Sequence, residues 1–388
     1  RRFHLTSHNP LKQSAATWCL LSCPSWCFLA CCGSVMASTL IFLLVLSSHL
    51  VVSSFAGKVD DGYPSGLRGL DENDAQPTSP KEHGITRLTG IPTNKRSIPE
   101  IFDSLQDIEA AGKDDPSARI VGGSFADPTR YPYFCRLTTL DIFGTERSCG
   151  CSLIARDMVI TAAHCYLDYQ DVIFFAEIIV NMTQSSTPTG YEQLAYIENG
   201  WFSTAYDPTT LADDFLLIKL DRQIFGIPTV RVNTNTGVPS VGRFMRAIGM
   251  GLTTTNGFAS SRLKEASVNA LPSSTCADLF GSPPFTDFNM ICAGDQGEGI
   301  CQGDSGGPLI IRGASASSDI QVGIASFTPA TGCAILGVPS GYARVSHFFT
   351  SPSLLFGQTV CERSASPPNY LCSGGATPNP TPRTPNPT

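Results

Sequence analysis

The chain has little charge, little helical periodicity and none of the common metal or phosphate motifs. Only 15% of its 388 residues are charged, and the formal net charge is −7. Such a chain lacks the surplus of cations that holds a nucleic-acid backbone, which argues against a nucleic-acid partner. Zinc-ligand spacing, a phosphate-binding glycine loop and an EF-hand loop are also missing. We therefore expect no metal and no cofactor.

Cysteine is missing from residues 57–119, although the chain holds 15 cysteines in all. Five precede Met36 and ten follow from Cys135 onward. An even group of ten indicates a disulfide framework, which is typical of secreted proteins. Residues 57–119 are polar and rich in Asp, Gly and Pro, so we expect little fixed structure there apart from a short helix over 103–111.

The N-terminal residues read as targeting sequence. Residues 1–35 show no clean period, and we interpret them as an unusual leader, either a non-native upstream translation or an extension. Residues 36–56 combine an apolar run with a small-residue end, Ser-Phe-Ala, which predicts a cleaved signal peptide and secretion. The alternative is a membrane anchor, but the apolar run 40–52 is short for a span of about 20 residues. We expect no stable membrane insertion after signal removal.

From residue 133 onward the sequence has many short apolar runs separated by turn residues. This pattern predicts an all-β domain. Helical patterns are limited to residues 276–280 and the segment after 345. The clearest expected strands are 158–161, 172–180, 215–220, 246–248, 308–311, 320–325 and 341–345.

One glycine-rich stretch, Cys-Gln-Gly-Asp-Ser-Gly-Gly-Pro over residues 301–308, suggests nucleophilic chemistry. Its glycines allow a sharp turn that aims neighbouring N–H groups at one point. The N–H groups of Gly303 and Ser305 are therefore candidates to hold an oxyanion. Ser305 is the candidate nucleophile, and a serine hydroxyl needs a base to become reactive.

The candidate base is His164, in the run Thr-Ala-Ala-His-Cys at 161–165. A catalytic histidine needs a carboxylate that fixes its tautomer. Asp214 opens the apolar run 214–220 and is the preferred candidate. The adjacent Asp213 competes with it, and we interpret Asp213 as a solvated neighbour.

The order of these motifs resembles that of the chymotrypsin family of serine protease zymogens. Arg-Ile-Val-Gly-Gly at 119–123 comes first, followed by the histidine motif, the Asp-led strand and the serine motif. The resemblance covers roughly residues 120–356. It implies two six-stranded Greek-key β-barrels, an active site in the cleft between them, a short C-terminal helix, and a peptidase domain over 120–360. His164 and Asp214 would come from the first barrel and Ser305 from the second.

The resemblance also implies activation by cleavage after Arg119, which makes residues 57–119 a propeptide. The new ammonium group at Ile120 would fold inward and pair with Asp304, because a buried carboxylate is costly without a partner. Without cysteine, the propeptide cannot stay attached through a disulfide.

Three disulfides follow from the resemblance: Cys149 with Cys165, Cys276 with Cys292, and Cys301 with Cys333. Cys135 and Cys151 depart from the family pattern. They flank a predicted hairpin symmetrically, so they form either an additional disulfide or two buried thiols. We expect Cys361 to pair with Cys372 in the tail.

The specificity pocket implied by the resemblance departs from that of trypsin. Gly299 replaces the aspartate that pairs with a substrate Lys or Arg, and Glu298 lies one position away. The resemblance implies that Ser326, Thr328 and Ser340 belong to the walls, where Thr328 and Ser340 would narrow the pocket. We expect a preference for small or medium apolar residues, with aromatic residues second. Such an enzyme would need a separate trypsin-like protease to cut at Arg119.

Two further features lie outside the catalytic motifs. Asn181-Met182-Thr183 is a glycosylation sequon, and residues 361–388 are expected to form a tail rich in Pro, Thr and Asn. The predicted function is a secreted, apolar-specific serine endopeptidase made as a zymogen, with protein or peptide substrates and protease inhibitors as partners. The alternative is a catalytically silent binding module, in which Thr328 would block the pocket. The complete Ser-His-Asp set favours the enzyme.

Overall fold

The computed structural model describes residues 84–109, 122–280, 288–294 and 296–372. All of them belong to one of the two compact units of the chain, Thr78–Thr388. The predicted leader, the predicted signal peptide, the beginning and end of the predicted propeptide and residues 373–388 lie outside the described residues. Among the described residues, no helix is both long and apolar enough to cross a membrane.

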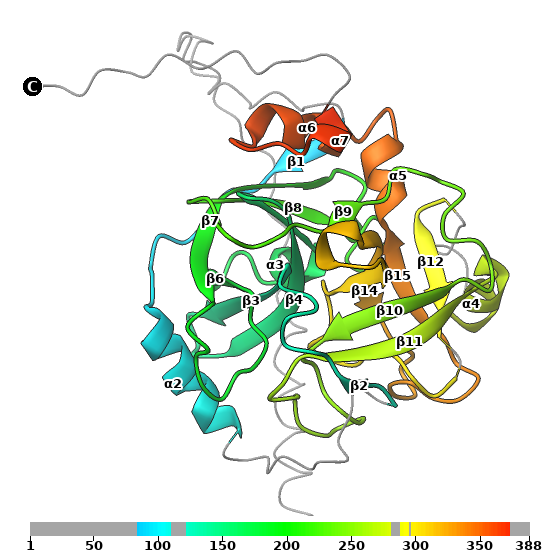
Figure 1. The fold of residues 1–388 in the computed structure, drawn as a ribbon, viewed down its shortest axis with the longest axis horizontal. Helices are drawn as coiled ribbons and strands as arrows, with labels where there is room; N and C mark the ends of the chain where they lie inside the picture. The colour runs from blue at the N-terminus through cyan, green and yellow to red at the C-terminus, as the bar shows by residue number, and fades with distance from the viewer. Residues whose placement is uncertain (1–83, 110–121, 281–287, 295, 373–388) are drawn as a thin grey trace, which may run out of the picture. The chain divides into compact units, whose positions relative to one another are not determined.

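The first half of this unit is a closed antiparallel barrel of six strands (Figure 1). Its order is β7-β6-β3-β4-β5-β8, and β8 pairs back with β7. Closure pairs both edges of the sheet, so no long edge is left exposed. The strands are β3 (Phe134–Asp141), β4 (Glu146–Ala155), β5 (Met158–Thr161), β6 (Ile173–Val180), β7 (Gln193–Ser203) and β8 (Leu216–Leu220).

The second half repeats this plan. The strand order is β10-β13-β14-β15-β12-β11, and β10 closes on β11. Residues along β11 alternate between buried and half-buried, as expected of a strand with one face in a core. The strands are β10 (Phe244–Gly249), β11 (Lys264–Leu271), β12 (Met290–Ala293), β13 (Pro308–Ile311), β14 (Ile320–Phe327) and β15 (Ser340–Arg344), with β2 (Ser124–Phe125) added to β11 and β9 (Arg231–Val232) to β14. The expected all-β fold of two six-stranded barrels is confirmed.

The C-terminal part of the described chain holds more helix than the sequence suggested. Phe215 stacks on Phe348 at 4.3 Å between ring centroids and meets Phe356 edge-on at 4.6 Å, so the helices pack on the first barrel. Structure therefore continues to Cys372, whereas we expected an extended tail from 361. The helices of the described chain are α2 (Ile98–Glu109), α3 (His164–Leu167), α4 (Ser273–Phe280), the short 3₁₀ helix η1 (Ala316–Ser318), α5 (Val345–Thr350), α6 (Phe356–Arg363) and α7 (Asn369–Cys372).

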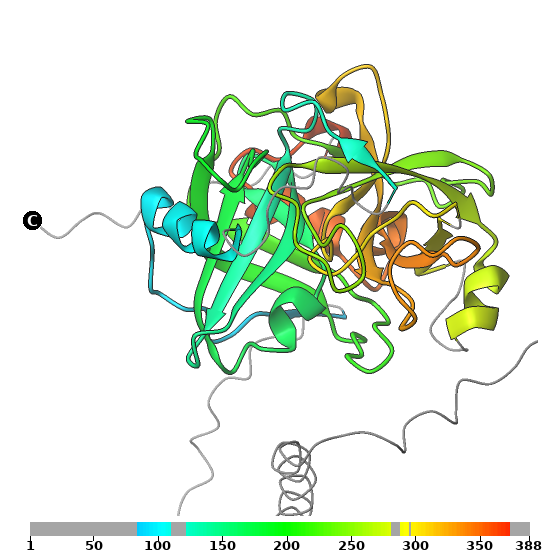
Figure 2. The ribbon, with the colours of Figure 1, turned by 90° about the horizontal axis from the view of Figure 1, so that it is seen from below.

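Residues 84–109 of the expected propeptide have a defined fold, which corrects the expectation of little fixed structure there. β1 (Ile85–Arg87) pairs with β7, and α2 lies on the outer side of the first barrel in both ribbon views (Figure 1 and Figure 2). The helix begins eleven residues after β1 and five residues before the expected start at 103. The polar composition of residues 57–119 did not predict this structure, because a few apolar residues at the right spacing are enough to dock the segment on the barrel.

Five disulfides are present among the described residues, and they are the five pairs that the sequence suggested. Cys135 and Cys151 face each other across β3 and β4, with their Cα atoms 4.8 Å apart. The other pairs are Cys149 with Cys165, Cys276 with Cys292, Cys301 with Cys333, and Cys361 with Cys372.

Candidate active site

His164 and Asp214 meet on the first barrel. His164 begins α3, just after β5, and Asp214 lies two residues before β8. His164 Nδ1 lies 2.8 Å from Asp214 Oδ2, and the His164 backbone N–H donates to Asp214 Oδ1 at 2.9 Å. With Nδ1 donating to the carboxylate, the neutral ring keeps its lone pair on Nε2, the nitrogen that can accept a proton.

The surroundings of this pair set the basicity of the histidine. Burial alone lowers the pKa of His164, but the charge of Asp214 and its hydrogen bond outweigh burial, so the pKa lies above its ordinary value. Asp214 is fully buried and also accepts a hydrogen bond from Ser326 Oγ at 2.6 Å. Three donors therefore fix the position of this carboxylate beside the histidine ring.

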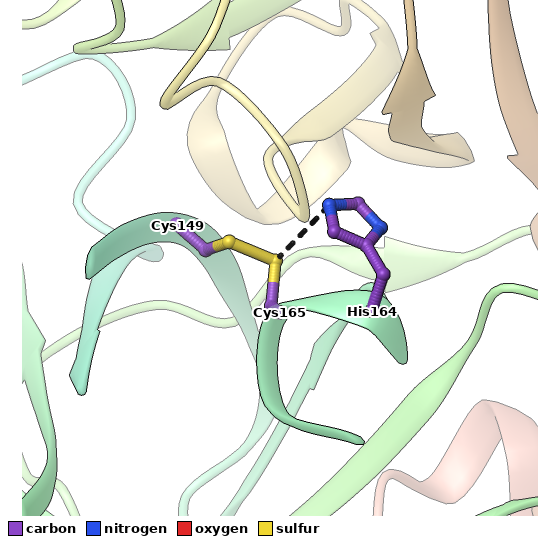
Figure 3. A group of neighbouring side chains, drawn as sticks. All are labelled: Cys149, His164 and Cys165. Atoms are coloured by element: carbon purple, nitrogen blue, oxygen red, sulfur yellow. Dashed lines mark hydrogen bonds between the residues drawn. A yellow bond between two sulfur atoms is a disulfide. The ribbon is translucent and has the colours of Figure 1, made fainter. Parts of the chain in front are cut away.

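Figure 3 shows His164 beside two sulfur atoms, a group whose distances would suit a metal ion. His164 Nε2 lies 3.8 Å from Cys165 Sγ. However, Cys165 is joined to Cys149 by a disulfide, and a metal ligand would have to be a thiolate. The donor set therefore does not fit a metal. The disulfide instead fixes the start of α3 to β4.

Ser305 lies in the turn that precedes β13 of the second barrel and is half-buried. Its carbonyl oxygen accepts a hydrogen bond from the Gly150 N–H of β4 at 2.7 Å. A Cβ atom at the next residue, Gly306, would collide with Thr161 Oγ1 and with the Gly150 carbonyl. Only glycine lets this turn pack against the first barrel at Thr161, which lies three residues before His164 in the chain. Within the described residues, no hydrogen bond joins Ser305 Oγ to the histidine ring.

Two backbone N–H groups around Ser305 are available. Gly303 adopts a φ of 90°, in the region that favours glycine. In the described part of the chain, the N–H groups of Gly303 and Ser305 have no protein acceptor. By contrast, the N–H group of Asp304 donates to the Cys301 carbonyl at 3.0 Å, and that of Gly306 donates to the Ala325 carbonyl at 2.8 Å. A cavity of about 40 Å³ lies beside Gly303, lined by residues of both barrels.

Asp304 is the second fully buried aspartate of this region. Its two carboxylate oxygens accept the Gly251 N–H at 2.7 Å and the Cys301 N–H at 2.8 Å. Burial raises its pKa to about 6, although these hydrogen bonds and the positive charge of the buried Lys264 act in the opposite direction. The residues expected to provide its ammonium partner, Arg119 and Ile120, lie outside the described residues.

Two of the expected pocket residues come together. A Cβ atom at the buried Gly299 would lie 4.0 Å from Ser340 Oγ and 3.7 Å from the Ala334 Cβ. The sequence analysis missed Ala334. Its position directly after Cys333, which is bonded to Cys301, was the available signal. Gly299, Ala334 and Ser340 are all small residues, and none of them carries a charge.

The other expected wall residues have different surroundings. Ser326 points its hydroxyl at Asp214, so its side chain supports the His164 pair. Thr328 lies just after β14 and is half-buried. Glu298 accepts a hydrogen bond from the Ser267 backbone N–H of β11 at 2.8 Å. Its carboxylate is therefore engaged with the strand rather than with the Gly299 group.

Two other polar residues can now be placed. Asp213 is not a solvated neighbour as expected, because it accepts Ser203 Oγ at 2.7 Å and lies 3.2 Å from His347 Nε2. Asn181 of the sequon is half-buried, and its Nδ2 donates to the Tyr191 carbonyl at 3.3 Å. Glycosylation at Asn181 would have to displace that bond, and it remains a prediction.

A histidine bonded to a buried aspartate on one six-stranded barrel, facing a serine turn of a second barrel, is the arrangement of the two-barrel serine proteases. Sequence comparison agrees with this class. A family profile described as Trypsin matches residues 120–350, more than half of the chain. The chain therefore belongs to the trypsin family, a family of serine-type endopeptidases.

Individual relatives are distant. A trypsin from Saccharopolyspora erythraea is 28% identical over 232 residues, which cover 59% of this chain and 95% of the relative. A chymase from Mus musculus is 27% identical over 245 residues, 61% of this chain and 90% of the relative. The serine proteinase stubble from Drosophila melanogaster is 28% identical over 306 residues, which are 72% of this chain but only 38% of that protein.

Proposed function

We propose that the protein is a secreted serine endopeptidase that hydrolyses peptide bonds through Ser305, His164 and Asp214. The observation that carries the proposal is the hydrogen bond from His164 Nδ1 to buried Asp214, which leaves Nε2 as the basic atom. The seating of the serine turn against the first barrel supports it, as does family membership. The mechanism follows the template established for this family.

In the proposed reaction, His164 Nε2 takes the proton of Ser305 as Oγ attacks the substrate carbonyl carbon. The negative charge that develops on the carbonyl oxygen is held by the N–H groups of Gly303 and Ser305, which have no other acceptor among the described residues. His164 then gives its proton to the leaving amine as the C–N bond breaks. Water repeats the two steps on the acyl-enzyme, which releases the acid and restores Ser305.

The proposed specificity is for apolar residues before the scissile bond. The small neutral group of Gly299, Ala334 and Ser340 supports it, because none of these side chains can pair with Lys or Arg. Engagement of Glu298 with β11 supports it as well. An extended substrate would add its main chain beside residues 326–328, in the manner of an additional strand.

The proposed enzyme is made as a zymogen and activated by a trypsin-like protease that cuts after Arg119. The buried carboxylate of Asp304 supports this step. Its raised pKa means that burial makes the charged carboxylate unfavourable in the uncut chain. A new ammonium group at Ile120 could therefore stabilise this carboxylate as an ion pair. The disulfides among the described residues are consistent with secretion.

The test uses the chain from Gly57 onward, treated briefly with trypsin and then with a fluorophosphonate probe and a peptide panel. The panel varies only the residue before the scissile bond. We expect labelling of Ser305 only after cleavage at Arg119, with Leu, Ala or Phe preferred over Arg. Ser305→Ala is the control and should remove labelling and lower turnover by several orders of magnitude.

Other outcomes of the same experiment contradict the proposal. Absence of labelling despite a correct Ile120 terminus would favour a silent binding module. Rapid hydrolysis after Arg would overturn the assignment of the Gly299 group. Activity retained in Ser305→Ala would exclude the mechanism altogether.

A further inference from the structure

Residues 84–109, termed the N-terminal arm, are bound to the first barrel through contacts of several kinds. β1 adds to β7 as an antiparallel strand, with Ile85 opposite Ser203 and Arg87 opposite Trp201. The ladder continues through the Leu88 N–H, which donates to Gly200 O at 2.8 Å. This is strand addition, a common mode by which one chain binds another.

The barrel surface has a shape that accommodates the arm. Leu88 is buried and lies directly over Gly200, where any Cβ atom would collide with its side chain. Ile85, Ile101 and Phe102 are all 2% exposed or less and belong to the same hydrophobic cluster as the core residues of the first barrel. Burial of four large apolar side chains provides a substantial hydrophobic contribution to docking.

The charge of the barrel surface also matches the arm. Glu177 of β6 has a side chain only 1% exposed, and both of its oxygens are bound by the Arg96 guanidinium. Arg96 also lies 3.5 Å from Glu146, and its backbone carbonyl accepts the Tyr196 hydroxyl. Without Arg96, the barrel would carry a buried carboxylate that has lost its main hydrogen-bond donor.

The arm holds its own local structure at this point. The Glu100 carboxylate at the start of α2 accepts both the Ser97 N–H at 2.6 Å and the Ser97 hydroxyl at 2.8 Å, which satisfies an N–H group at the helix start. Within the described residues, none of the hydrogen bonds of the arm involves His164, Asp214 or Ser305. Its strand pairing and its ion pairs are instead with residues of the first barrel and with Asp221 after β8.

We propose that the N-terminal arm stays bound after cleavage between Arg119 and Ile120, so that the mature enzyme is a complex of two chains without a disulfide between them. The proposal rests on the activation cleavage proposed above. The arm ends ten residues before Arg119, and its contacts are with β4, β6, β7 and Asp221, the residue that follows β8. Cleavage removes one peptide bond and leaves these contacts intact.

The experiment cuts the Ser305→Ala protein in two different ways. One sample is cut by brief trypsin treatment at Arg119. In the other, a recognition site for a sequence-specific protease replaces residues 112–117 and is cut without creating the Ile120 terminus. Each product is passed over native gel filtration at micromolar concentration, and its peaks are identified by mass spectrometry. We expect the arm fragment to co-elute with the barrels in both samples and to separate only in denaturant.

The two cuts separate the two proposals. Failure of trypsin to cut at Arg119 would count against the proposed activation, and the second sample would still test the arm. Separate elution of the arm fragment from the barrels in that second sample would overturn the inference about the arm.

Variants within the arm test which contacts hold it. We expect Arg96→Ala to weaken binding of the cut arm by about 100-fold or more, because it breaks a buried ion pair. Lys95→Ala is the matched control, since Lys95 is 51% exposed and its bond to Asp221 should change binding less than about fivefold. Ile101→Asp leaves the charges of the barrel unchanged and should also release the arm. Equal retention of all three variants would contradict the assigned contacts.

Discussion

Asp214 and Asp304 are both fully buried beside the candidate nucleophile, but their partners differ. Asp214 accepts from a histidine ring, a backbone N–H and the Ser326 hydroxyl. Asp304 accepts two backbone N–H groups, and its pKa is raised to about 6 by burial. Two equally buried carboxylates therefore differ in the number and kind of their hydrogen-bond donors. The first-barrel half of the site is complete in the uncut chain, whereas the second-barrel half retains a poorly satisfied acid.

The largest effect is expected from Asp214→Asn in the cleaved enzyme. The amide keeps the shape but cannot hold Nδ1–H as a carboxylate does, so His164 loses the correct tautomer. We expect kcat to fall by about 10⁴-fold, the loss known for the equivalent change in a well-studied member of this family. The change also removes the charge that raises the pKa of His164. The acid limb of any residual activity should therefore move to lower pH, because the base stays unprotonated further down.

The neighbouring Asp213 offers a matched control for this prediction. Asp213 has its own partners, Ser203 and His347, and among the described residues no hydrogen bond joins it to His164. Asp213→Asn should keep kcat within about tenfold of the wild type, as a change of supporting packing alone would do. Similar losses at both positions would mean that the assignment of the orienting carboxylate is wrong.

The next effect is a pH dependence of stability that Asp304 gives to the uncut chain. Its folded-state pKa of about 6 lies above the ordinary value of 3.8, so the folded form binds more protons between these values. Stability from this group is then complete below about pH 4 and is lost as the pH rises to about 6. The loss amounts to about 3 kcal/mol. Urea unfolding of uncut Ser305→Ala protein between pH 4 and 7 measures it.

Other carboxylates contribute with the opposite sign, so the prediction concerns a difference. Asp221, for example, has its pKa lowered to about 2 by its ion partners and hydrogen bonds, which outweigh burial. The double variant Ser305→Ala, Asp304→Asn lacks the Asp304 contribution, and its stability relative to the single variant should rise with pH over this window. After cleavage at Arg119 the difference should shrink or reverse, because an ammonium partner lowers the pKa of Asp304. Identical pH curves for the uncut pair would contradict the poorly satisfied acid.

Much of this architecture could be predicted because short motifs fix local chemistry. The motifs around His164, Asp214 and Ser305 occur in the order shown by one known protease family. That resemblance predicted that the three residues share one site. Short apolar runs separated by turn residues predicted several of the strands, and the family resemblance predicted their arrangement in two barrels. The symmetric spacing of Cys135 and Cys151 about a hairpin suggested their bond. In each case the determining contacts are near in sequence or belong to a known motif.

The parts that were missed depend on contacts between residues far apart in the chain. Leu88 fills the space over Gly200, and Arg96 meets Glu177 some 81 positions later, so the polar composition of residues 57–119 concealed a docked arm. Ser326 was assigned to the pocket because its strand lies there, but its hydroxyl turns to Asp214. Side-chain direction at a strand end is decided by the nearest strong acceptor, which the sequence does not reveal.

Ser326→Ala should give the smallest effect on kcat. It tests whether the third donor to Asp214, which Asp304 lacks, contributes to stability or to the reaction. The change removes one of three donors to Asp214 and leaves both bonds to His164 in place. A hydrogen bond to a buried charge contributes about 1.5–3 kcal/mol. Because the Asp214 carboxylate is charged in both the ground state and the transition state, most of this free energy should be lost from folding stability. We expect kcat to fall by about tenfold or less. Urea unfolding and steady-state kinetics of the cleaved enzyme separate the two. A loss of kcat as large as that of Asp214→Asn, with unchanged stability, would mean that Ser326 acts in the reaction itself.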